Sequence, residues 1–574
     1  MSERYTYIIV GAGSAGCVLA SRLSEETSNR VLLLEAGGED WSPLIRIPIG
    51  TGKMLRRGGL HGWSLYTEPS AAVAGRREFW PRGRVIGGSS SINGMQYMRG
   101  HPADYDRWRD MGNPGWGYED VLPYFLKSEG HESRGLPYHN QRGPLHVQKA
   151  SSPNPLYPAF IRAAVEAGFP ACDDFNGQTQ EGFGRYEFTI RRGRRWSAAR
   201  AFLDQARRRP NLRVVTRAHA KRVLFQGRRA IGVEYSRFGK TVQAFADAEV
   251  IICAGAIHSP FLLLHSGIGD TGALSKLGIP SITHLPSVGS NLQDHPTIAV
   301  QYGCTQPLTL HSLVRVDRAA LMMARAVLMR SGPGTSFPVE AGGFSRTRPG
   351  LARPNIQWHF VLGLGLAALR WPGFGGDKLS REGFSIGINN LDTKSRGTVS
   401  LVSADPFAAP KIESGYFSVP DDLDTLVEAV AEVRKVAAQP ALAPFVEEEI
   451  APGPGTQNAD EIADWVRATV GSGKHPCGTC RMGSDDAAVV DPELRVRSVE
   501  RLRVVDASIM PTIVAGGLNA TTIMIAEKAA DLIHANARDM GGRPADVRKD
   551  AASRAAGDLE SRSIHLVEPA QHRH

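Results

Sequence analysis

The chain has 574 residues, of which 42% are hydrophobic, 22% charged and 7% aromatic. This composition is that of a globular protein and excludes a disordered or fibrous chain, while the length exceeds what a single hydrophobic core serves, so we expect at least two substructures. The formal charge of +9 would suit an anionic partner, but the basic residues are scattered and the densest run, 191–195, has no interleaved aromatic residues; we expect a solvated loop there and no nucleic-acid partner.

The number of cysteines and the first 20 residues indicate where in the cell the protein is located. Six cysteines in a chain of this length argue against a disulfide-stapled secreted protein. The first residues run directly into a strand-like segment, which leaves no room for a signal peptide. The early apolar stretch, 7–20, contains three glycines and is too short to span a bilayer. We therefore expect a cytoplasmic protein with at most a peripheral association with the inner membrane.

The first predicted elements form a βαβ unit. A buried strand at 5–10 is followed by the glycine loop 11–16, a helix at 17–23 and a second buried strand at 30–34 that ends at Glu35. The glycines allow close approach of the backbone to a pyrophosphate, the helix N-terminus stabilises its charge, and Glu35 can bond ribose hydroxyls. This motif predicts a bound dinucleotide and does not separate NAD from FAD.

Further strands continue this domain after a gap. Residues 40–80 are rich in glycine and proline and predict irregular structure over a ligand. Strands are predicted at 212–216, 222–225, 230–235, 249–253 and just before Asp506, with a helix at 520–535. The cofactor domain is thus assembled from separated pieces of the chain.

The region from about 300 to 470 differs in character. Alternating segments at 355–361, 384–388 and 397–402 predict a half-buried antiparallel sheet. A helix is predicted at 421–437, after Pro420. We interpret this region as a second domain.

Two longer segments carry a family resemblance. Residues 83–97, continuing to Asp106, and residues 255–269 resemble the paired signatures of the glucose-methanol-choline (GMC) oxidoreductases. The resemblance covers the chain from residue 5 to about 535. It implies an α/β Rossmann-like FAD-binding domain that is split in sequence, and an α+β substrate domain with a six-stranded antiparallel sheet. The expected bounds are 1–155, 196–299 and 472–537 for the FAD domain, 156–195 and 300–471 for the substrate domain, and 538–574 for a poorly packed C-terminal extension.

The resemblance also implies the cofactor contacts. A Gly-Ser run suits a segment that lies against a flat ring. Some GMC members attach the flavin through a histidine at the position of Ile92, so we predict non-covalent FAD. Ala220, Ala254 and Asp506 match family positions for the adenosine end, the buried strand edge and the ribityl-proximal contact. The predicted cofactor-binding residues are Gly11, Gly13, Ser14, Ala15, Gly16, Glu35, Ala36, Trp63, Arg84, Val85, Gly87, Gly88, Ser89, Asn93, Gly94, Met95, Ala220, Ala254, Gly255, Asp506, Ala507, Asn519 and Thr521.

A catalytic pair is predicted near the C-terminus. Residues 474–483 resemble the family segment HPxGTxxMG, and residues 517–528 resemble its closing segment, in which a His or Asn completes the pair. His475 and Asn519 match these positions. An alcohol gives up hydride readily as its hydroxyl proton leaves, so a base with a pKa near neutrality is needed. A neutral amide can hold the same oxygen without competing for the proton.

Other histidines and cysteines receive simpler interpretations. His258, His265 and His295 are expected to be packing residues. Cys477 and Cys480 have the spacing of a redox or metal pair, but no second CxxC supplies further zinc ligands, so we predict no metal and no functional disulfide. Cys477 is expected to line the pocket beside His475.

The predicted function is oxidation of a primary alcohol, with the flavin reoxidised by a quinone, another acceptor or O2. A dehydrogenase is favoured over an oxidase, because the chain is most similar to the bacterial choline-dehydrogenase-like branch. Alternatives of the same fold are a hydroxynitrile lyase, a light-driven decarboxylase and a catalytically silent flavin-binding protein; His475 and Asn519 disfavour the last. Monomer and dimer both remain open.

The predicted pocket segments also bear on the substrate. Met322, Trp358, Leu362 and Trp371 give them an apolar character. That favours an aliphatic or aromatic alcohol over choline, whose cation would need an acid and an aromatic cage.

Overall fold

The computed structural model describes residues 3–365 and 381–541. Residues 1–529 form one compact unit, and the chain from 530 onward forms a second. The described part of the second unit is the end of helix α14 (Leu518–Gly541). Trp371 and the extension beyond 541 lie outside the described residues. Among the helices that are described, none combines the length and the apolar character needed to cross a membrane.

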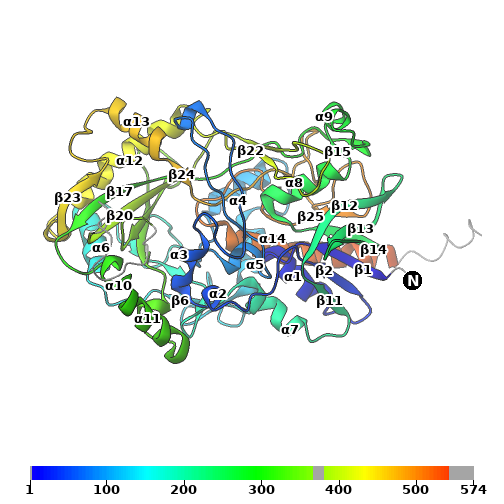
Figure 1. Cartoon of the computed structure of the whole chain (residues 1–574), viewed down its shortest axis with the longest axis horizontal. Helices are drawn as coiled ribbons and strands as arrows, with labels where there is room; N and C mark the ends of the chain where they lie inside the picture. Colours follow the sequence, from blue (N-terminus) through cyan, green and yellow to red (C-terminus); the bar gives the residue numbers. More distant parts are fainter. Residues whose placement is uncertain (1–2, 366–380, 542–574) are drawn as a thin grey trace, which may run out of the picture. The chain divides into compact units, whose positions relative to one another are not determined.

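The first sheet is built around the predicted βαβ unit (Figure 1). Helix α1 (Ser14–Leu23) connects two parallel strands that pair from Tyr7–Val31 to Val10–Leu34. The strand order is β11-β2-β1-β14-β13-β12, with β25 beside β14. The bounds are β1 Arg4–Val10, β2 Val31–Leu34, β11 Leu212–Val215, β12 Ala218–Gln226, β13 Arg229–Arg237, β14 Lys240–Ile252 and β25 Leu502–Val504.

Long strand β14 joins two kinds of pairing in this sheet. Its first part is antiparallel to β13, and its last part is parallel to both β1 and β25. Strands far apart in the sequence therefore end at one edge, where Val10, Leu34 and Ile252 lead into the glycine loop, Glu35 and Ala254. The split assembly predicted from the sequence places these residues together.

The second sheet is antiparallel throughout and has the order β23-β17-β20-β19-β18-β7. A seventh strand, β24, pairs with the beginning of β17, whereas we expected six. β17 is long enough to pair with β24 and β23 along the same edge. The bounds are β7 Gly182–Arg185, β17 Pro296–Cys304, β18 Ala341–Ser345, β19 Ile356–Val361, β20 Gly383–Asn390, β23 Val446–Ala451 and β24 Gly471–Ser472.

Several expectations for this region need correction. Every residue of β20 is buried, so this strand is not half-buried: helix α12 (Asp421–Ala437) packs on one face and a cavity lies on the other. The segment at 397–402 is not part of this sheet, because β21 (Thr398–Ser400) pairs only with β22 (Lys411–Glu413). The expected domain boundary at 299/300 falls within β17, which belongs entirely to the second sheet.

Helix α12 shows why the outer layer forms. Acidic residues occupy its first turn and Arg434 and Lys435 its last, which complements the helix dipole. Leu426, Val430 and Val433 recur at helical spacing and are fully buried in the core over the second sheet. Helices α6 (Leu156–Glu166) and α13 (Ala459–Thr469) pack beside it. This layer leaves the opposite face of the sheet for a ligand.

The remaining elements are mostly short connections. Residues 40–80 contain only single-turn helices and a two-residue strand, close to the predicted irregular structure. Longer elements are α4 Pro102–Asp110, α5 Tyr118–Ser128, α8 Gly255–His265, α9 Thr271–Lys276, α11 Val316–Ala324, β6 Leu145–Lys149, and the flanking β5 Glu129–His131. Single turns and short strands are α2 Pro43–Arg46, η1 Pro48–Gly50, α3 Thr51–Met54, β3 Gly62–Trp63, η2 Ala71–Val73, β4 Arg82–Gly83, η3 Gly88–Ser91, β8 Glu187–Phe188, β9 Ile190–Arg191, β10 Arg194–Arg195, η4 Ala199–Leu203, α7 Asp204–Ala206, β15 Ile268–Gly269, β16 Thr283–His284, α10 Leu310–Leu313, η5 Arg325–Met329, η6 Pro333–Thr335, η7 Ala443–Phe445 and η8 Ala507–Ile509.

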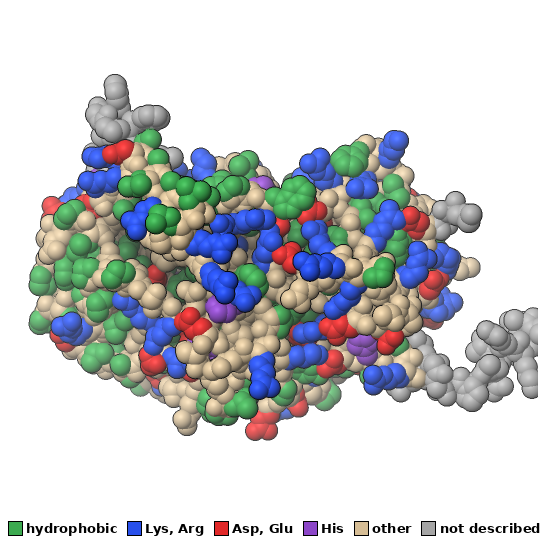
Figure 2. Space-filling view, turned by 90° about the horizontal axis from the view of Figure 1, so that it is seen from below, with side chains coloured by type: hydrophobic (Ala, Val, Ile, Leu, Met, Phe, Trp, Pro, Cys, Tyr) green, Lys and Arg blue, Asp and Glu red, His purple; other side chains and the backbone are tan. Residues whose placement is uncertain are grey.

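Basic residues do not gather in one patch on the face shown in Figure 2, where Lys and Arg side chains are interspersed with acidic and hydrophobic ones. The predicted solvated loop at 191–195 is instead a short hairpin, β9 and β10. Arg195 in it is buried and donates to the carbonyl oxygens of Ile45 and Ser90, so this part of the prediction was wrong.

Candidate active site

A cavity of about 640 Å³ lies between the edge of the first sheet and the open face of the second. Most of the predicted residues line it. They are Gly11, Gly13, Ser14, Ala15, Glu35, Ala36, Trp63, Gly88, Ser89, Asn93, Gly94, Met95, Ala220, Ala254, Gly255, His475, Asp506, Ala507 and Asn519. Ile92 lines it as well. Five predicted residues do not: Gly16, Arg84, Val85, Gly87 and Thr521.

The glycine loop leaves space for a ligand to lie close to the protein backbone. Gly11 has φ +103°, and a Cβ there would lie 2.5 Å from the carbonyl oxygen of Cys253. At Gly13 the nearest atom to such a Cβ is 3.9 Å away, so this residue presents open space to the cavity. Main-chain N–H groups at the start of α1 follow directly. This loop fits a dinucleotide pyrophosphate.

Three predicted cofactor residues lie outside the cavity lining and contribute through packing. A Cβ on Gly16 would lie 1.9 Å from the carbonyl oxygen of Gly11, so glycine is needed there for α1 to approach β1. Thr521 is fully buried and its hydroxyl bonds Tyr105 at 2.8 Å. Gly87 donates its N–H to Ala12, which ties the second glycine-rich segment to the first loop. These residues support the cavity from outside.

Glu35 ends the second strand as predicted. Its two carboxylate oxygens accept the N–H groups of Ala12 (2.9 Å) and Gly37 (2.7 Å). Burial raises the pKa of this carboxyl to about 7, against the opposing effect of the two N–H groups. Arg84 lies outside the main cavity, where its guanidinium stacks 4.4 Å from the Trp63 ring and lines a neighbouring pocket.

His475 stands at the opposite side of the cavity, just after β24. Its backbone N–H donates to Asp294 (2.6 Å), and the Asp294 carboxylate also accepts from Tyr416 and Ser472. The Nδ1 atoms of His475 and His295 are 3.0 Å apart. Burial, followed by the neighbouring His295 and Arg82, holds the pKa of His475 well below its usual value. The imidazole is therefore neutral, and it is a weaker base than the histidine with a pKa near neutrality that the sequence predicts.

Asn519 lies on the glycine-loop side. Its Oδ1 accepts a hydrogen bond from the Ser14 hydroxyl at 2.7 Å. The residue of the closing segment that faces the base is Gly517, where a Cβ would lie 3.8 Å from Nε2 of His475. The residue next to Nε2 thus has no side chain, which leaves room beside the base for a substrate.

Comparison with known proteins decides the family. Two models described as GMC oxidoreductase match residues 5–297 and 393–526. The chain belongs to the GMC oxidoreductase family. It is 45% identical over 542 residues to mitochondrial choline dehydrogenase of Homo sapiens, covering 92% of this chain and 90% of the relative.

Two solved structures are similar to this GMC oxidoreductase. Pyridoxine 4-oxidase from Mesorbium loti has a TM-score of 0.82 at 33% identity, covering 92% of this chain and 99% of that one. An R554A variant of formate oxidase from Aspergillus oryzae RIB40, studied for FAD modification, has a TM-score of 0.86 at 26% identity, covering 94% and 100%. The enzyme is an FAD-dependent oxidoreductase that acts on CH–OH donors, and a hydroxynitrile lyase is not favoured.

The substrate side of this GMC oxidoreductase differs from the sequence-based expectation. Trp358 and Leu362 are buried in the core beneath the second sheet and do not line the cavity, and neither does Met322. Because side chains alternate along β19, its odd-numbered residues Gln357 and His359 face the cavity instead. The apolar lining comes from residues that the prediction did not include: Ile298, Phe337, Val339 and Val361.

Other predicted roles also change. His295 is not only a packing residue, because it contacts His475. Cys477 is fully buried and does not line the cavity. Cys477 and Cys480 are both free thiols, and burial raises the pKa of each. Lys474 and Arg82 line the cavity near His475 and were missed; the position of Lys474 directly before the predicted base was the available signal.

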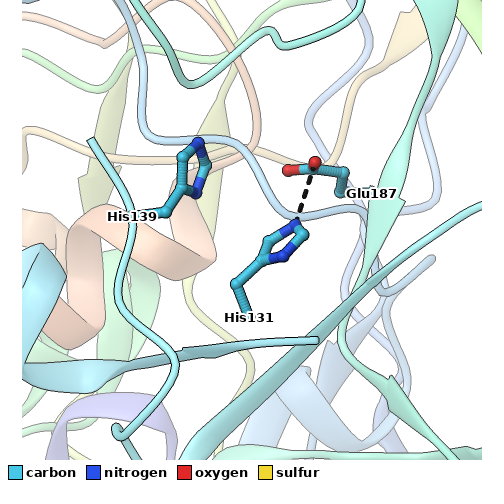
Figure 3. A group of neighbouring side chains, drawn as sticks. All are labelled: His131, His139 and Glu187. Carbon is cyan, nitrogen blue, oxygen red and sulfur yellow. Dashed lines mark hydrogen bonds and ion pairs between the residues drawn. The ribbon is translucent and has the colours of Figure 1, made fainter. Parts of the chain in front are cut away.

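A second cluster of titratable groups lies outside the cavity (Figure 3). His131 donates through Nε2 to Glu187 at 3.0 Å, and its Nδ1 accepts two backbone N–H groups. His139 contacts Glu129 and Asp174 at 3.1 and 2.9 Å through its two nitrogens. Burial lowers the pKa of His139, but the two carboxylates outweigh it and raise the pKa to about 9. Every ring nitrogen of the two histidines is thus engaged in a hydrogen bond or an ion pair.

Proposed function

We propose that this enzyme oxidises a primary alcohol to an aldehyde with His475 as the general base. The observation that carries the proposal is that His475 lines the cavity that also contains the glycine loop, with Gly517, which has no side chain, next to its Nε2. FAD, when bound, supplies the hydride acceptor at its N5 atom. His475 takes the hydroxyl proton as hydride leaves the carbinol carbon.

His295 is proposed to orient that base. The pKa of His295 is lowered to about 3, chiefly by burial, so both rings are neutral and one proton lies between their Nδ1 atoms. If His475 donates this proton to His295, its Nε2 carries the free lone pair that a base needs. The hydrogen bond from His475 N–H to Asp294 fixes the backbone at the same point.

Asn519 is proposed to act from the glycine-loop side. Its oxygen is engaged by Ser14, while no described residue accepts a hydrogen bond from its amide nitrogen. Its N–H groups are therefore available to a ligand in the cavity. For this reason we keep Asn519 as the predicted partner of His475. Gly517 leaves the space between that ligand and His475 open.

We also propose that the FAD is non-covalent, because Ile92 in the cavity wall has no nucleophilic atom. The FAD domain is proposed to comprise the first sheet and its helices, and the substrate domain the second sheet with α6, α12 and α13. A cytoplasmic location and reoxidation by a quinone or another acceptor are proposed in preference to reaction with O2. Any membrane association is proposed to be at most peripheral, and the protein is proposed to be a monomer or a dimer.

Choline is not the proposed substrate, although the human relative is named for it. The acids that line the cavity are Glu35 and Asp506, and both belong to the glycine-loop side. Near His475 the described lining contains Arg82 and Lys474. A quaternary ammonium would meet two like charges there.

Anaerobic mixing with primary alcohols tests the proposed function. The flavin absorbance is expected to bleach as the alcohol is oxidised, with the aldehyde formed in equal amount. A lyase would leave the flavin oxidised while converting its substrate. Failure of every alcohol in a panel of neutral, anionic and cationic compounds to reduce the flavin would reject the proposal.

The pH dependence gives a second prediction. Only neutral His475 accepts a proton, so kcat/KM falls as the pH drops through its pKa. Because that pKa is lowered, the acid limb is expected to have its midpoint below the ordinary histidine value of about 6.5. Steady-state measurements from acidic to alkaline pH check this; a midpoint at or above that value would contradict the assignment.

A further inference from the structure

Two cations lie unpaired in the wall of the cavity beside His475. Arg82 donates through Nε to the carbonyl of Pro81 (2.6 Å) and through Nη2 to the carbonyl of Lys474 (2.8 Å). Lys474 donates through Nζ to the carbonyl of Ser472 at 3.3 Å. Neither forms an ion pair with a described residue, which leaves Nη1 of Arg82 and most of the donors of the Lys474 ammonium without an acceptor.

Two of the three arginines classed as buried in the described part of the chain form ion pairs. Arg99 contacts Glu129 at 2.7 Å, and Arg503 contacts Glu249 at 2.6 Å. Arg195 has no carboxylate partner, but its three guanidinium nitrogens donate to backbone carbonyls and a threonine hydroxyl. Charged groups withdrawn from water normally have such partners. Arg82 and Lys474 have no carboxylate in ion-pair contact among the described residues, although the charge of Asp294 acts on both.

The nearby carboxylates are committed elsewhere. Asp294 accepts from Tyr416, Ser472 and the backbone of His475. Glu78 forms an ion pair with Arg76. With Glu78 paired to Arg76, the two cations exceed the one remaining carboxylate, Asp294, whose charge acts on both of them.

The position of Lys474 places this charge on the substrate side. It follows β24, which pairs with β17 of the second sheet, and it directly precedes the base. After burial, its charge is a further cause of the lowered pKa of His359, about 4, on strand β19 of the same sheet. The ammonium therefore lies within electrostatic range of His359, a cavity-lining residue of the second sheet.

We propose that Arg82 and Lys474 bind an anionic group of the alcohol, so that the substrate class is the hydroxy acids, compounds that carry a carboxylate as well as the primary carbinol. This rests on the proposed function, because it names the substrate of the same site. The carboxylate takes no part in the reaction: hydride leaves the carbinol carbon for the flavin, the hydroxyl proton goes to His475, and an aldehyde acid is released. The two cations orient the carbinol through the other end of the molecule.

A matched pair of substrates tests the proposal on the holoenzyme. 4-(Hydroxymethyl)benzoate and its methyl ester differ in charge and share the reacting group. Anaerobic flavin reduction is expected to show kcat/KM at least about tenfold higher for the acid, as a charge-assisted hydrogen bond provides. Lys474→Met should lower the ratio of acid to ester by about ten- to a hundredfold, and Lys474→Arg should restore most of it.

Exposed Lys276 in helix α9 provides the control, since Lys276→Met removes a charge outside the cavity and should keep the wild-type ratio. Equal kcat/KM for acid and ester in the wild type would overturn the inference while leaving alcohol oxidation intact. Equal losses for both substrates in Lys474→Met, with a changed flavin midpoint potential, would also overturn it, because the lysine would then serve the reduced cofactor. If neither compound nor any other alcohol reduces the flavin, the proposed function itself fails.

Discussion

Replacing His475 with alanine is expected to lower the rate of flavin reduction by an alcohol by roughly 10²- to 10⁴-fold, with FAD still bound. The variant removes the cavity-lining imidazole whose Nε2 lies next to Gly517. It leaves the backbone N–H that donates to Asp294 and the glycine loop on the other side of the cavity. Anaerobic stopped-flow spectroscopy measures the reduction, and the flavin absorbance of the purified protein reports the bound cofactor.

The residual activity carries its own signature. Without a base, only alcohol that has already lost its proton reacts readily, so the rate should rise with pH over the alkaline range and the acid limb should disappear. Exposed His284 in β16 offers a matched control, and His284→Ala should behave as wild type. Reduction at the wild-type rate in His475→Ala, or an unchanged acid limb, would remove His475 from the mechanism.

Local patterns predicted much of the fold because the physical cause was local too. The predicted βαβ unit consists of β1, the glycine loop, α1 and β2, and β2 leads directly into Glu35. Helix α12 spans the predicted residues 421–437, since its acidic start and apolar spacing are contained in one segment. Burial of β20 on both faces depends on α12 and the cavity, which no alternation within the strand reveals.

The candidate site was less predictable because it joins distant segments. Strand β24 has two residues and no recognisable pattern, yet it brings His475 to the cavity through pairing with β17. His295 meets His475 across 180 positions of sequence. Trp358 and His359 are neighbours in the chain, but strand geometry sends one to the core and the other to the cavity. A motif also does not separate a residue that lines the cavity from one that packs behind it, and Gly16 and Thr521 are of the second kind.

Alanine substitutions at Gly13 and Gly16 are expected to fail in different ways. At Gly16 the added Cβ would overlap the carbonyl oxygen of Gly11, at 1.9 Å, so α1 must move away from β1. We expect a loss of more than about 4 kcal/mol of stability and little folded enzyme. At Gly13 the backbone is extended and the nearest atom is 3.9 Å away, so the chain folds. There the methyl group enters the space that suits the pyrophosphate, and FAD affinity is expected to fall by about tenfold or more.

Thermal unfolding at increasing FAD concentration separates the two cases. A ligand that binds only the folded state stabilises it by an amount that grows with the logarithm of its concentration. Excess FAD should therefore return Gly13→Ala to nearly the wild-type Tm, because its defect is in affinity. It should not rescue Gly16→Ala, in which the two elements that create the site no longer pack together. The same response to FAD in both variants would show that the loop does not divide its glycines between ligand contact and helix packing.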